Sequence, residues 1–447
     1  MKRYFLLLFV PLSLSCSLFK GKLVPYPGGV VFPLAEAQQI SYEGKILQSI
    51  KRSAEELYFS TDTGLLYCLD SSSPNIKWTF TADSPFGCPP SVGPDAIFIW
   101  DQANTLYCLD KKGTLRWKKT LKEKISSPPS CDQENVYVGT QEKTFLAISQ
   151  SSGESLWQLK AGGAFEAGAI FWKNKIIAGC ADGRLYFLSR SQDLESTVDI
   201  GSPIRVTPLL DGDRLYFGAE NFTFQCFDLV KKKTKWRIKA GGNLLLPPHA
   251  DEGRVFFFAS NSVLYCLNKR GGDILWWWIV PSRNVYDLEL AADKVLVTPF
   301  LPVLIGLDRK TGKEIGKYDA KLGMKSNPVW NDPYVVVSLY DDVAKKGAML
   351  YLGKEVSVRL RPSLRSPQPA GTEITFTASA VGFYLPKYEF CLRDGGVKAI
   401  VQPGSGRNSW VWYPEKEGDY TIGVKVVDQK QTREVELSFN VAAKKEK

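Results

Sequence analysis

Short apolar segments, rich in β-branched and aromatic residues, alternate along the chain with turns of Gly, Asp, Asn and Ser. One segment recurs in nearly the same form, as an apolar run that ends just before a polar turn. The last apolar residue of each copy serves as a marker: Leu69, Leu109, Ile148, Leu188, Phe227, Leu267 and Leu307. Successive markers are 39 or 40 residues apart. A period of this length predicts a repeat protein in which each unit is one supersecondary structure.

Each unit of about 40 residues contains four short stretches of strand-like composition. The first often opens with proline, as at Pro89 and Pro128, and the second is an apolar run such as Ile97–Ile99. The third carries the marker residue, and the fourth carries a tryptophan in five of the copies. Four short strands per unit, separated by turn residues, are the signature of a β-propeller blade.

The last unit supplies only three strands, between residues 327 and 352. We expect the early segment around Val30-Val31-Phe32 to provide the fourth strand, which would join the two ends of the ring and cover two sheet edges. Seven marked units and this composite unit predict an all-β protein with an eight-bladed propeller. A seven-bladed ring is the alternative, if the final strands serve another role.

The seventh copy, Leu307-Asp308-Arg309-Lys310-Thr311-Gly312, resembles the quinoprotein-type (PQQ-like) repeat, whose consensus is Ala-x-Asp-x-x-Thr-Gly-x-x-x-Trp. The resemblance covers residues 24–353 and implies that the repeat tryptophan docks between neighbouring blades, where a large aromatic buries much area. Two copies lack the tryptophan, at Thr197 and Gly316, and we expect looser junctions there. The tryptophan is present at Trp78, Trp117, Trp157, Trp236 and Trp276.

The period stops at about residue 354, where a proline-rich junction begins. Short alternating strands follow and predict an immunoglobulin-like β-sandwich over residues 354–443, before a basic tail at 444–447. Glu417-Gly418-Asp419-Tyr420 resembles the Gly-x-Tyr corner of immunoglobulin-like and PKD-like bacterial modules. Such modules usually act as spacers or binding surfaces.

The first residues read as an export signal: Lys2 and Arg3 are basic, and Tyr4–Val10 is apolar. Ser13-Leu14-Ser15-Cys16 resembles a bacterial lipobox, with Ser13 where an apolar residue is usual. We therefore expect a signal peptide at 1–15, lipidation of Cys16 and a tether over 16–23. An ordinary cleaved signal with an incidental cysteine is the alternative. Because no apolar run reaches about 18 residues, the mature protein is expected to be tethered to a membrane rather than integral.

The formal charge of +10 comes from 57 basic and 47 acidic residues, spread over turns. This indicates a solvated surface, with attraction to an anionic membrane as the alternative, and does not favour nucleic acid. Nine cysteines suggest disulfides, but Cys68, Cys108, Cys226 and Cys266 occupy equivalent positions in different repeats, too far apart to bond. We expect them to be small buried strand residues. With one histidine in the chain, no metal or cofactor site is predicted.

The repeat family includes quinone-dependent dehydrogenases, which carry a calcium site and often an adjacent cysteine pair. This chain has no such pair, and its repeat aspartates fall at turn positions, where they cap their own backbone. We predict no catalytic residues and no enzyme. His249 is expected to be structural, with a channel-facing functional role as the alternative. In Trp276-Trp277-Trp278 at least one ring must leave the blade interior; Trp277 and Trp278 either pack against an adjoining segment or contact a partner.

The complete pattern of signal, cysteine and repeat propeller resembles the scaffold lipoprotein of the outer-membrane β-barrel assembly machinery, the BamB type. The resemblance implies a monomer on the periplasmic side of the outer membrane that docks on the barrel-assembly subunit. It also implies engagement of unfolded outer-membrane proteins, for which strand addition at a blade edge is the plausible mode. The C-terminal sandwich departs from that pattern. The alternative is a surface or periplasmic lipoprotein that binds protein or glycan, and a quinone-dependent dehydrogenase is the remote one.

Overall fold

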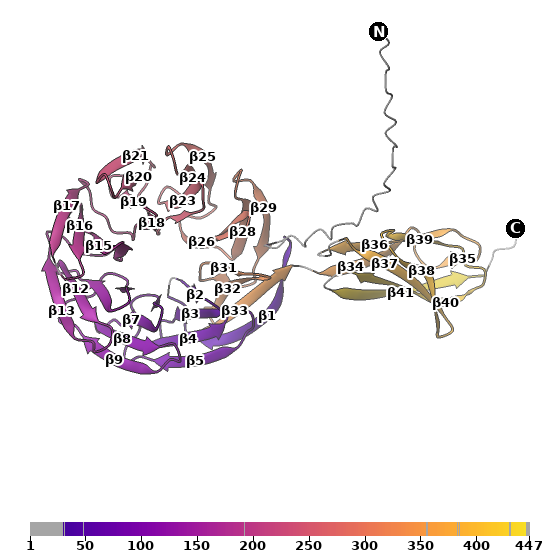
Figure 1. Ribbon diagram of the computed structural model, residues 1–447. Coiled ribbons are helices and arrows are strands. Elements are labelled where there is room, and N and C mark those ends of the chain that lie inside the picture. The colour runs from indigo at the N-terminus through magenta and orange to yellow at the C-terminus, as the bar shows by residue number, and fades with distance from the viewer. Residues whose placement is uncertain are drawn as a thin grey trace, which may run out of the picture.

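The computed structural model describes residues 30–443, apart from positions 31, 48, 192, 355, 382, 384, 429 and 430. Every regular element in these residues is a β-strand, and none of them forms a helix of a length and apolarity that would cross a membrane. The strands build a closed ring of sheets and a smaller two-sheet body beside it (Figure 1). The expected signal peptide, Cys16, its tether and the basic tail lie outside the described residues.

Seven four-stranded antiparallel sheets follow one another around the ring, each formed by four consecutive strands. The strands nearest the centre are short in six of the sheets: β2 (Lys51–Ser53), β6 (Ser91–Val92), β10 (Ser130–Cys131), β14 (Ile170–Trp172), β18 (Leu209–Asp211) and β22 (His249–Ala250). In the seventh sheet the inner strand is the longer β26 (Val285–Ala291). The second strands are β3 (Glu56–Ser60), β7 (Ala96–Trp100), β11 (Asn135–Gly139), β15 (Lys175–Gly179), β19 (Arg214–Ala219), β23 (Arg254–Ala259) and β27 (Lys294–Pro299).

The marker residues lie on the third strands, and the repeat tryptophans lie on the outermost ones. The third strands are β4 (Leu65–Asp70), β8 (Thr105–Asp110), β12 (Thr144–Ser149), β16 (Arg184–Ser189), β20 (Thr223–Asp228), β24 (Val263–Asn268) and β28 (Val303–Asp308). The outer strands are β5 (Ile76–Thr81), β9 (Leu115–Thr120), β13 (Ser155–Lys160), β17 (Leu194–Asp199), β21 (Lys233–Lys239), β25 (Ile274–Ile279) and β29 (Glu314–Asp319).

One five-stranded sheet joins the two ends of the ring. It contains β30 (Gly323–Met324), β31 (Val329–Asn331), β32 (Tyr334–Asp341), β33 (Lys346–Lys354) and β1 (Leu34–Glu43). β1 runs antiparallel to β33, from the pair Leu34 and Lys354 to the pair Glu43 and Lys346. An N-terminal strand therefore does complete the last sheet, but the predicted segment around Val30–Phe32 is wrong. The closing strand is outermost and exposes polar residues at alternate positions of its outer face, so it carries no continuous apolar run that would reveal it in the sequence.

The core lies between the faces of adjacent sheets. Second and third strands are almost entirely buried, whereas outer strands alternate between exposed and half-buried positions. In the first interface, Tyr58 and Leu66 of one sheet pack with Ile97 and Tyr107 of the next. A side chain of this size contributes about 1.5–3 kcal/mol when it is fully buried, so each sheet is held mainly by its two neighbours.

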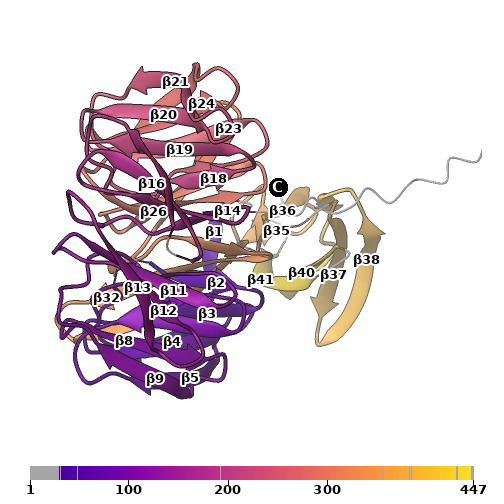
Figure 2. The same ribbon diagram turned by 60° about the vertical axis from the view of Figure 1, so that its left-hand side comes forward.

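The C-terminal body contains two facing sheets around one apolar cluster that includes Phe376, Phe390 and Phe439. Tyr420 donates a hydrogen bond from its hydroxyl to the Lys416 carbonyl, 3.0 Å away. Figure 2 shows this body at the side of the ring, and β34 begins three residues after β33 ends. The first sheet contains β34 (Ser357–Pro362), β36 (Ile374–Val381) and β39 (Ser409–Trp412). The second contains β35 (Gln368–Pro369), β41 (Thr432–Ala442), β40 (Gly418–Val427), β37 (Lys387–Asp394) and β38 (Val397–Ser405).

Candidate functional site

The repeat tryptophans form one contact five times. Each indole Nε1 donates a hydrogen bond to a backbone carbonyl in the following sheet, always 33 residues further along the chain. The distances lie between 2.8 and 3.1 Å. The pairs are Trp78 with Lys111, Trp117 with Gln150, Trp157 with Arg190, Trp236 with Lys269 and Trp276 with Arg309. The tryptophans thus bind neighbouring sheets together and are not available for a ligand.

Glycine completes this contact at four of the five junctions. Gly153 has a φ of +74°, and a Cβ there would lie 2.8 Å from the Trp117 ring. A side chain would therefore be strained by the backbone and would also push the indole away. Gly113, Gly272 and Gly312 face Trp78, Trp236 and Trp276 in the same way.

The prediction that Thr197 replaces a tryptophan is wrong by one residue. The third-strand residue Phe187 pairs with Ser196, as Cys108 pairs with Trp117, so Ser196 occupies the docking position. The turn before this strand is one residue shorter than in most copies, which shifts the register. Lys232 takes the place of the glycine: its ammonium lies 5.2 Å from the Phe187 ring centre and donates to Ser196 Oγ at 2.6 Å. A cation on an aromatic ring replaces the indole contact here.

At Gly316 the missing indole is replaced by a side chain from the start of the chain. A Cβ on Gly316 would meet Phe32 at 2.5 Å, and a Cβ on its cross-strand partner Gly306 would meet the same ring at 2.2 Å. Phe32 therefore fills the space that two glycines leave open. The expectation of a looser junction overlooked this filling, because Phe32 is distant in sequence.

Ring closure adds polar contacts between the last sheet and the first. The buried side chain of Asn327 accepts a hydrogen bond from the Ile50 amide at 2.7 Å and donates to the Ile50 carbonyl at 3.2 Å. The Tyr351 hydroxyl donates to the Asp70 carbonyl at 2.7 Å. We call the junction between the closing sheet and the first sheet the seam. Its hydrogen bonds hold these two sheets together, as the tryptophans do at other junctions.

A cavity of about 480 Å³ lies at the centre of the ring. Residues from all seven four-stranded sheets line it, among them the Pro-Pro-Ser segments 89–91 and 128–130. Arg205 projects into this region and binds two carboxylates, Glu166 Oε1 at 2.5 Å and Glu220 Oε1 at 2.8 Å. The lining combines prolines, hydroxyls and paired charges, which suits a solvated channel better than a tight pocket for an apolar ligand.

His249 lies on β22 beside this channel and pairs with Asp287 of the next sheet, Nε2 to Oδ1 at 2.9 Å. Burial alone would lower the pKa of His249, but the charge and hydrogen bond of Asp287 outweigh it and raise the pKa. Burial raises the pKa of nearby Glu289. Among the described residues no Ser, Thr or Cys side chain hydrogen-bonds to His249, so the pair has no adjacent nucleophile of the kind that a hydrolytic triad needs. No group of three or more potential metal ligands occurs within them either.

The three consecutive tryptophans of β25 separate by alternation. Trp276 is buried in the docking contact, Trp277 is 58% exposed, and Trp278 is half-buried against the next sheet's core. Of the two predicted partner contacts, Trp277 alone presents most of its ring to solvent. That Trp277 and Trp278 contact a partner stays a prediction.

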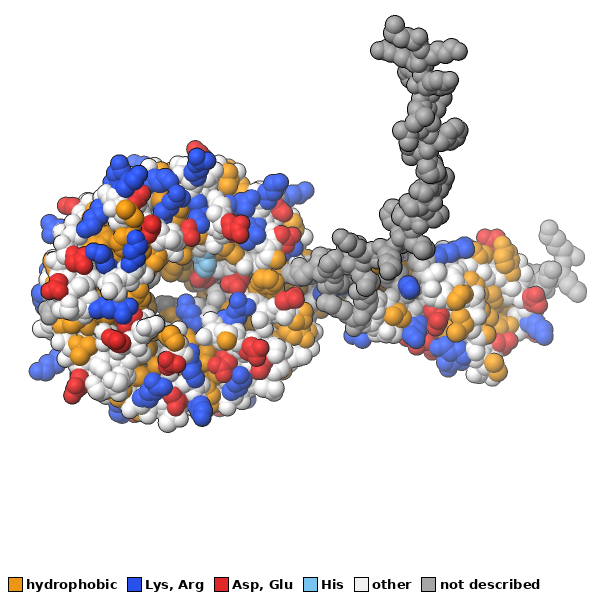
Figure 3. Space-filling view, in the orientation of Figure 1, with side chains coloured by type: hydrophobic (Ala, Val, Ile, Leu, Met, Phe, Trp, Pro, Cys, Tyr) orange, Lys and Arg blue, Asp and Glu red, His pale blue; other side chains and the backbone are white. Residues whose placement is uncertain are grey.

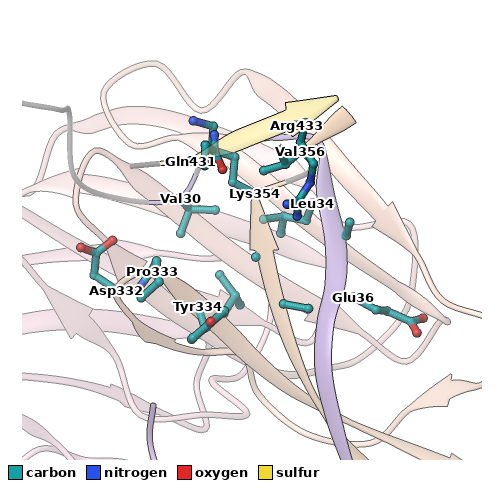
Figure 4. A pocket seen from close by; sticks show the side chains of 14 residues that line it. Val30, Leu34, Glu36, Asp332, Pro333, Tyr334, Lys354, Val356, Gln431 and Arg433 are labelled. Carbon is teal, nitrogen blue, oxygen red and sulfur yellow. The ribbon is translucent and has the colours of Figure 1, made fainter. Parts of the chain in front are cut away.

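A second hollow of about 480 Å³ lies between β1 and the C-terminal body (Figure 4). Both signs of charge line it, so it favours no single class of ligand. Its labelled residues are Val30, Leu34, Glu36, Asp332, Pro333, Tyr334, Lys354, Val356, Gln431 and Arg433.

The cysteines behave as predicted from the repeat. All eight described cysteines are free, and the four at equivalent repeat positions are buried. Burial raises the pKa of Cys68 and Cys266 to about 12 and that of Cys108 to about 11, so these thiols are protonated at neutral pH. Protonated buried thiols are poor nucleophiles.

Residues 62–195 and 191–331 match the family model described as outer membrane protein assembly factor BamB. Together these segments cover more than half of the chain. The chain belongs to the BamB family. The BamB of Shewanella oneidensis is 24% identical over 268 residues, which are 54% of this chain and 66% of that protein. The BamB of Moranella endobia is 17% identical over 293 residues, 63% of this chain and 66% of that protein. The chain thus matches just under two thirds of the length of either relative.

Solved structures agree on the fold. The crystal structure of BamB from Moraxella catarrhalis superposes with a TM-score of 0.61 at 17% identity, covering 72% of this chain and 97% of that one. The computationally designed Ika8 protein superposes almost as well, with a TM-score of 0.59 at 12% identity over 70% of this chain and 97% of its own. Because a designed protein shares the BamB-like propeller fold, this likeness establishes the fold and leaves the function to other observations.

Proposed function

We propose that this protein is a non-catalytic, lipid-anchored propeller scaffold that binds other proteins of the bacterial cell envelope and serves outer-membrane β-barrel assembly. The observation that carries the proposal is the match of residues 62–331 to the BamB family. The contacts of the site support a scaffold, because the tryptophans of the repeat hold sheets together and the channel residue Arg205 is paired with Glu166 and Glu220.

The finer architecture follows the same proposal. We take each sheet of the ring as one blade, so the eight sheets support eight blades rather than seven. The C-terminal body, proposed to extend from 354 to 443, is taken as an immunoglobulin-like module. Its two facing sheets and the Tyr420 hydrogen bond to the backbone four residues earlier support this assignment, because a corner tyrosine of this kind is typical of such sandwiches.

The proposed cellular location of the protein rests on the sequence. We propose that residues 1–15 are removed, that Cys16 is lipidated, and that residues 16–23 tether the propeller, proposed over 24–353, to the outer membrane on its periplasmic side. The chain is proposed to act as a monomer, with no cofactor and no nucleic acid. The relatives are named as outer-membrane protein assembly factors, which supports this location.

Photo-crosslinking in intact envelopes tests the scaffold. A photoreactive residue at Leu245, which is exposed and lines the channel, is compared with one at Leu156 on an outer strand. Val397 in the C-terminal body, which is also exposed, is the matched control. We expect at least one propeller position to crosslink to an outer-membrane β-barrel protein. If neither propeller position does, while Val397 captures a protein or glycan outside the cell, the alternative of a surface ligand-binding lipoprotein replaces the scaffold.

A further inference from the structure

The outer strands of the seven four-stranded sheets have equivalent solvent-facing positions, so their residues can be compared position by position. Positions one and three residues after the docking position face solvent in every strand. In β25 they hold Trp277 and Ile279, which are 58% and 61% exposed. The other six strands carry polar or charged residues there: Thr79, Thr81, Lys118, Thr120, Gln158, Lys160, Thr197, Asp199, Arg237, Lys239, Lys317 and Asp319. The apolar side chains of β25 are therefore not a requirement of the blade.

The apolar character of β25 extends to its neighbour on the same face. Trp277 is opposite Tyr265, and Ile279 is opposite Val263, on the partner strand β24. Leu275 precedes them on β25 and is 47% exposed. Tyr265 and Val263 are half-buried, so we call the three exposed residues, Leu275, Trp277 and Ile279, the apolar patch. Large exposed apolar patches on a soluble protein mark surfaces that bind a partner or a membrane.

The adjacent outer strand, β21, is basic at every solvent-facing position. Lys233, Lys235, Arg237 and Lys239 alternate with half-buried residues and point outward. Within the part of the chain that the structure describes, none of these four has a carboxylate within 4.0 Å, and Arg237 Nε donates to the Gln225 amide oxygen at 3.2 Å instead. We call these four residues the basic row. β21 and β25 are neighbours on the ring (Figure 1), and Lys and Arg side chains gather on that part of its surface (Figure 3).

The combination of apolar and basic residues favours one kind of partner for this surface. The apolar patch and the basic row belong to different sheets, so a single extended peptide that paired with the β25 edge would leave the basic row uncovered. A lipid surface is wide enough to contact both. Tryptophan prefers the headgroup region of a bilayer, where its ring is partly apolar and partly polar. Basic side chains beside it attract anionic headgroups.

We propose that the outer strands of the fifth and sixth sheets, β21 and β25, form a peripheral binding site for an anionic lipid surface. Trp277, Ile279 and Leu275 insert shallowly between headgroups, and Lys233, Lys235, Arg237 and Lys239 bind their phosphates. The exposed edge of β25 limits the depth, because unpaired backbone groups do not enter the hydrocarbon core. The site fixes the orientation of the ring on the membrane, independently of any lipid anchor.

Vesicle flotation tests this site. The chain from residue 17 onward, without an acyl group, contains every described residue and isolates the peripheral contact. It is mixed with vesicles of phosphatidylcholine alone or of phosphatidylcholine with phosphatidylglycerol. We expect binding to the anionic vesicles only, weakened about fivefold for each basic residue of the row replaced by Gln. The variant W277T/I279T, which copies Thr79 and Thr81, is expected to lose at least about tenfold in affinity.

The control variant Leu156→Thr removes an equally exposed apolar side chain from an outer strand without a neighbouring basic row, and is expected to bind like the parent. Equal unfolding temperatures of all variants separate loss of the site from loss of the fold. The proposal is overturned if the parent does not float, if W277T/I279T floats like the parent, or if an acidic extended peptide binds β25 while anionic vesicles do not. Failure here leaves the scaffold proposal intact, because crosslinking to a β-barrel protein tests that separately.

Discussion

Phe32 replaces the missing tryptophan at the junction between the seventh four-stranded sheet and the closing five-stranded sheet. This packing can be tested by mutation. In the native chain, Gly316→Ala places a methyl group 2.5 Å from Cγ of Phe32, close to the root of that side chain. The ring must shift together with its backbone, and overpacking of this kind costs about 1–3 kcal/mol. Phe32→Gly alone removes a half-buried ring together with its Cβ and should cost about 2–4 kcal/mol, which reaches below the roughly 3–5 kcal/mol of fully buried aromatics.

The double variant decides whether the two positions share one space. The Cβ of Phe32 would itself lie 2.6 Å from the methyl group that Gly316→Ala introduces, so the partner variant has to remove this Cβ as well as the ring. In the Phe32→Gly background the three atoms nearest the methyl group are gone, and the reduced freedom of the unfolded chain makes the change from glycine stabilising by up to about 1 kcal/mol. The sign of the Gly316→Ala effect therefore reverses between the two backgrounds, with a coupling free energy above about 1 kcal/mol.

Denaturant unfolding of the four chains, followed by tryptophan fluorescence, measures this coupling. Gly253→Ala is the matched control, because a Cβ there meets nothing within 4 Å, and it should change the free energy of unfolding by less than about 0.5 kcal/mol. Additive effects of Phe32→Gly and Gly316→Ala, within about 0.5 kcal/mol, would refute the packing argument.

Three further predictions follow from the junctions and the channel. Gly153→Ala should cost at least about 1 kcal/mol from its positive φ, and more from its contact with Trp117, as measured by thermal unfolding; an unchanged midpoint would contradict the docking geometry. Asn327→Ala leaves two buried groups of Ile50 unpaired and should cost about 2–3 kcal/mol, with faster amide exchange in β1 and β2; exchange that accelerates equally in all sheets would show that Asn327 does not act at the seam. Because burial of His249 is outweighed by Asp287, which raises the folded pKa, the folded state binds the proton more tightly than the unfolded chain. That stabilisation is complete below the ordinary imidazole pKa and is lost as pH rises through the raised one, so the parent should lose more stability than Asp287→Asn from pH about 6 upward; parallel stability curves would rule the pair out.

Much of the fold follows from the repeat period, because each unit carries the same signals for four strands and five of the seven units also carry the interface tryptophan. The prediction of the docking position fails in the fourth sheet, where the turn before β17 is one residue shorter than in most copies. Ser196 rather than Thr197 occupies the docking position, and a period counted in residues does not detect a register that is set by strand pairing. The closing strand Leu34–Glu43 was not predicted for another reason. It is polar on the outside of the ring, and it pairs with a strand about 310 residues away in the sequence.

The candidate sites also divide into those that the sequence predicts and those that only the structure reveals. The roles of the five tryptophans are local properties of the repeat, and Trp277 is recognisable as exposed from alternation alone. By contrast, the pair of His249 and Asp287, and the Phe32 ring over Gly306 and Gly316, join segments that no pattern relates. The apolar patch and the basic row become visible when equivalent outer positions of all seven sheets are compared, which requires the register that the structure supplies.

The central claim, that this propeller is a scaffold for barrel assembly, is tested most directly by affinity purification of the chain from detergent-solubilised envelopes. The bait carries an affinity tag, and its partners are identified by mass spectrometry. Proteins that are also recovered from cells with an untagged chain are discounted. The account predicts recovery of an outer-membrane β-barrel protein of the assembly machinery in amounts comparable to the bait. Clean recovery of the bait without any β-barrel protein, together with its digestion by protease added to intact cells, would contradict the account.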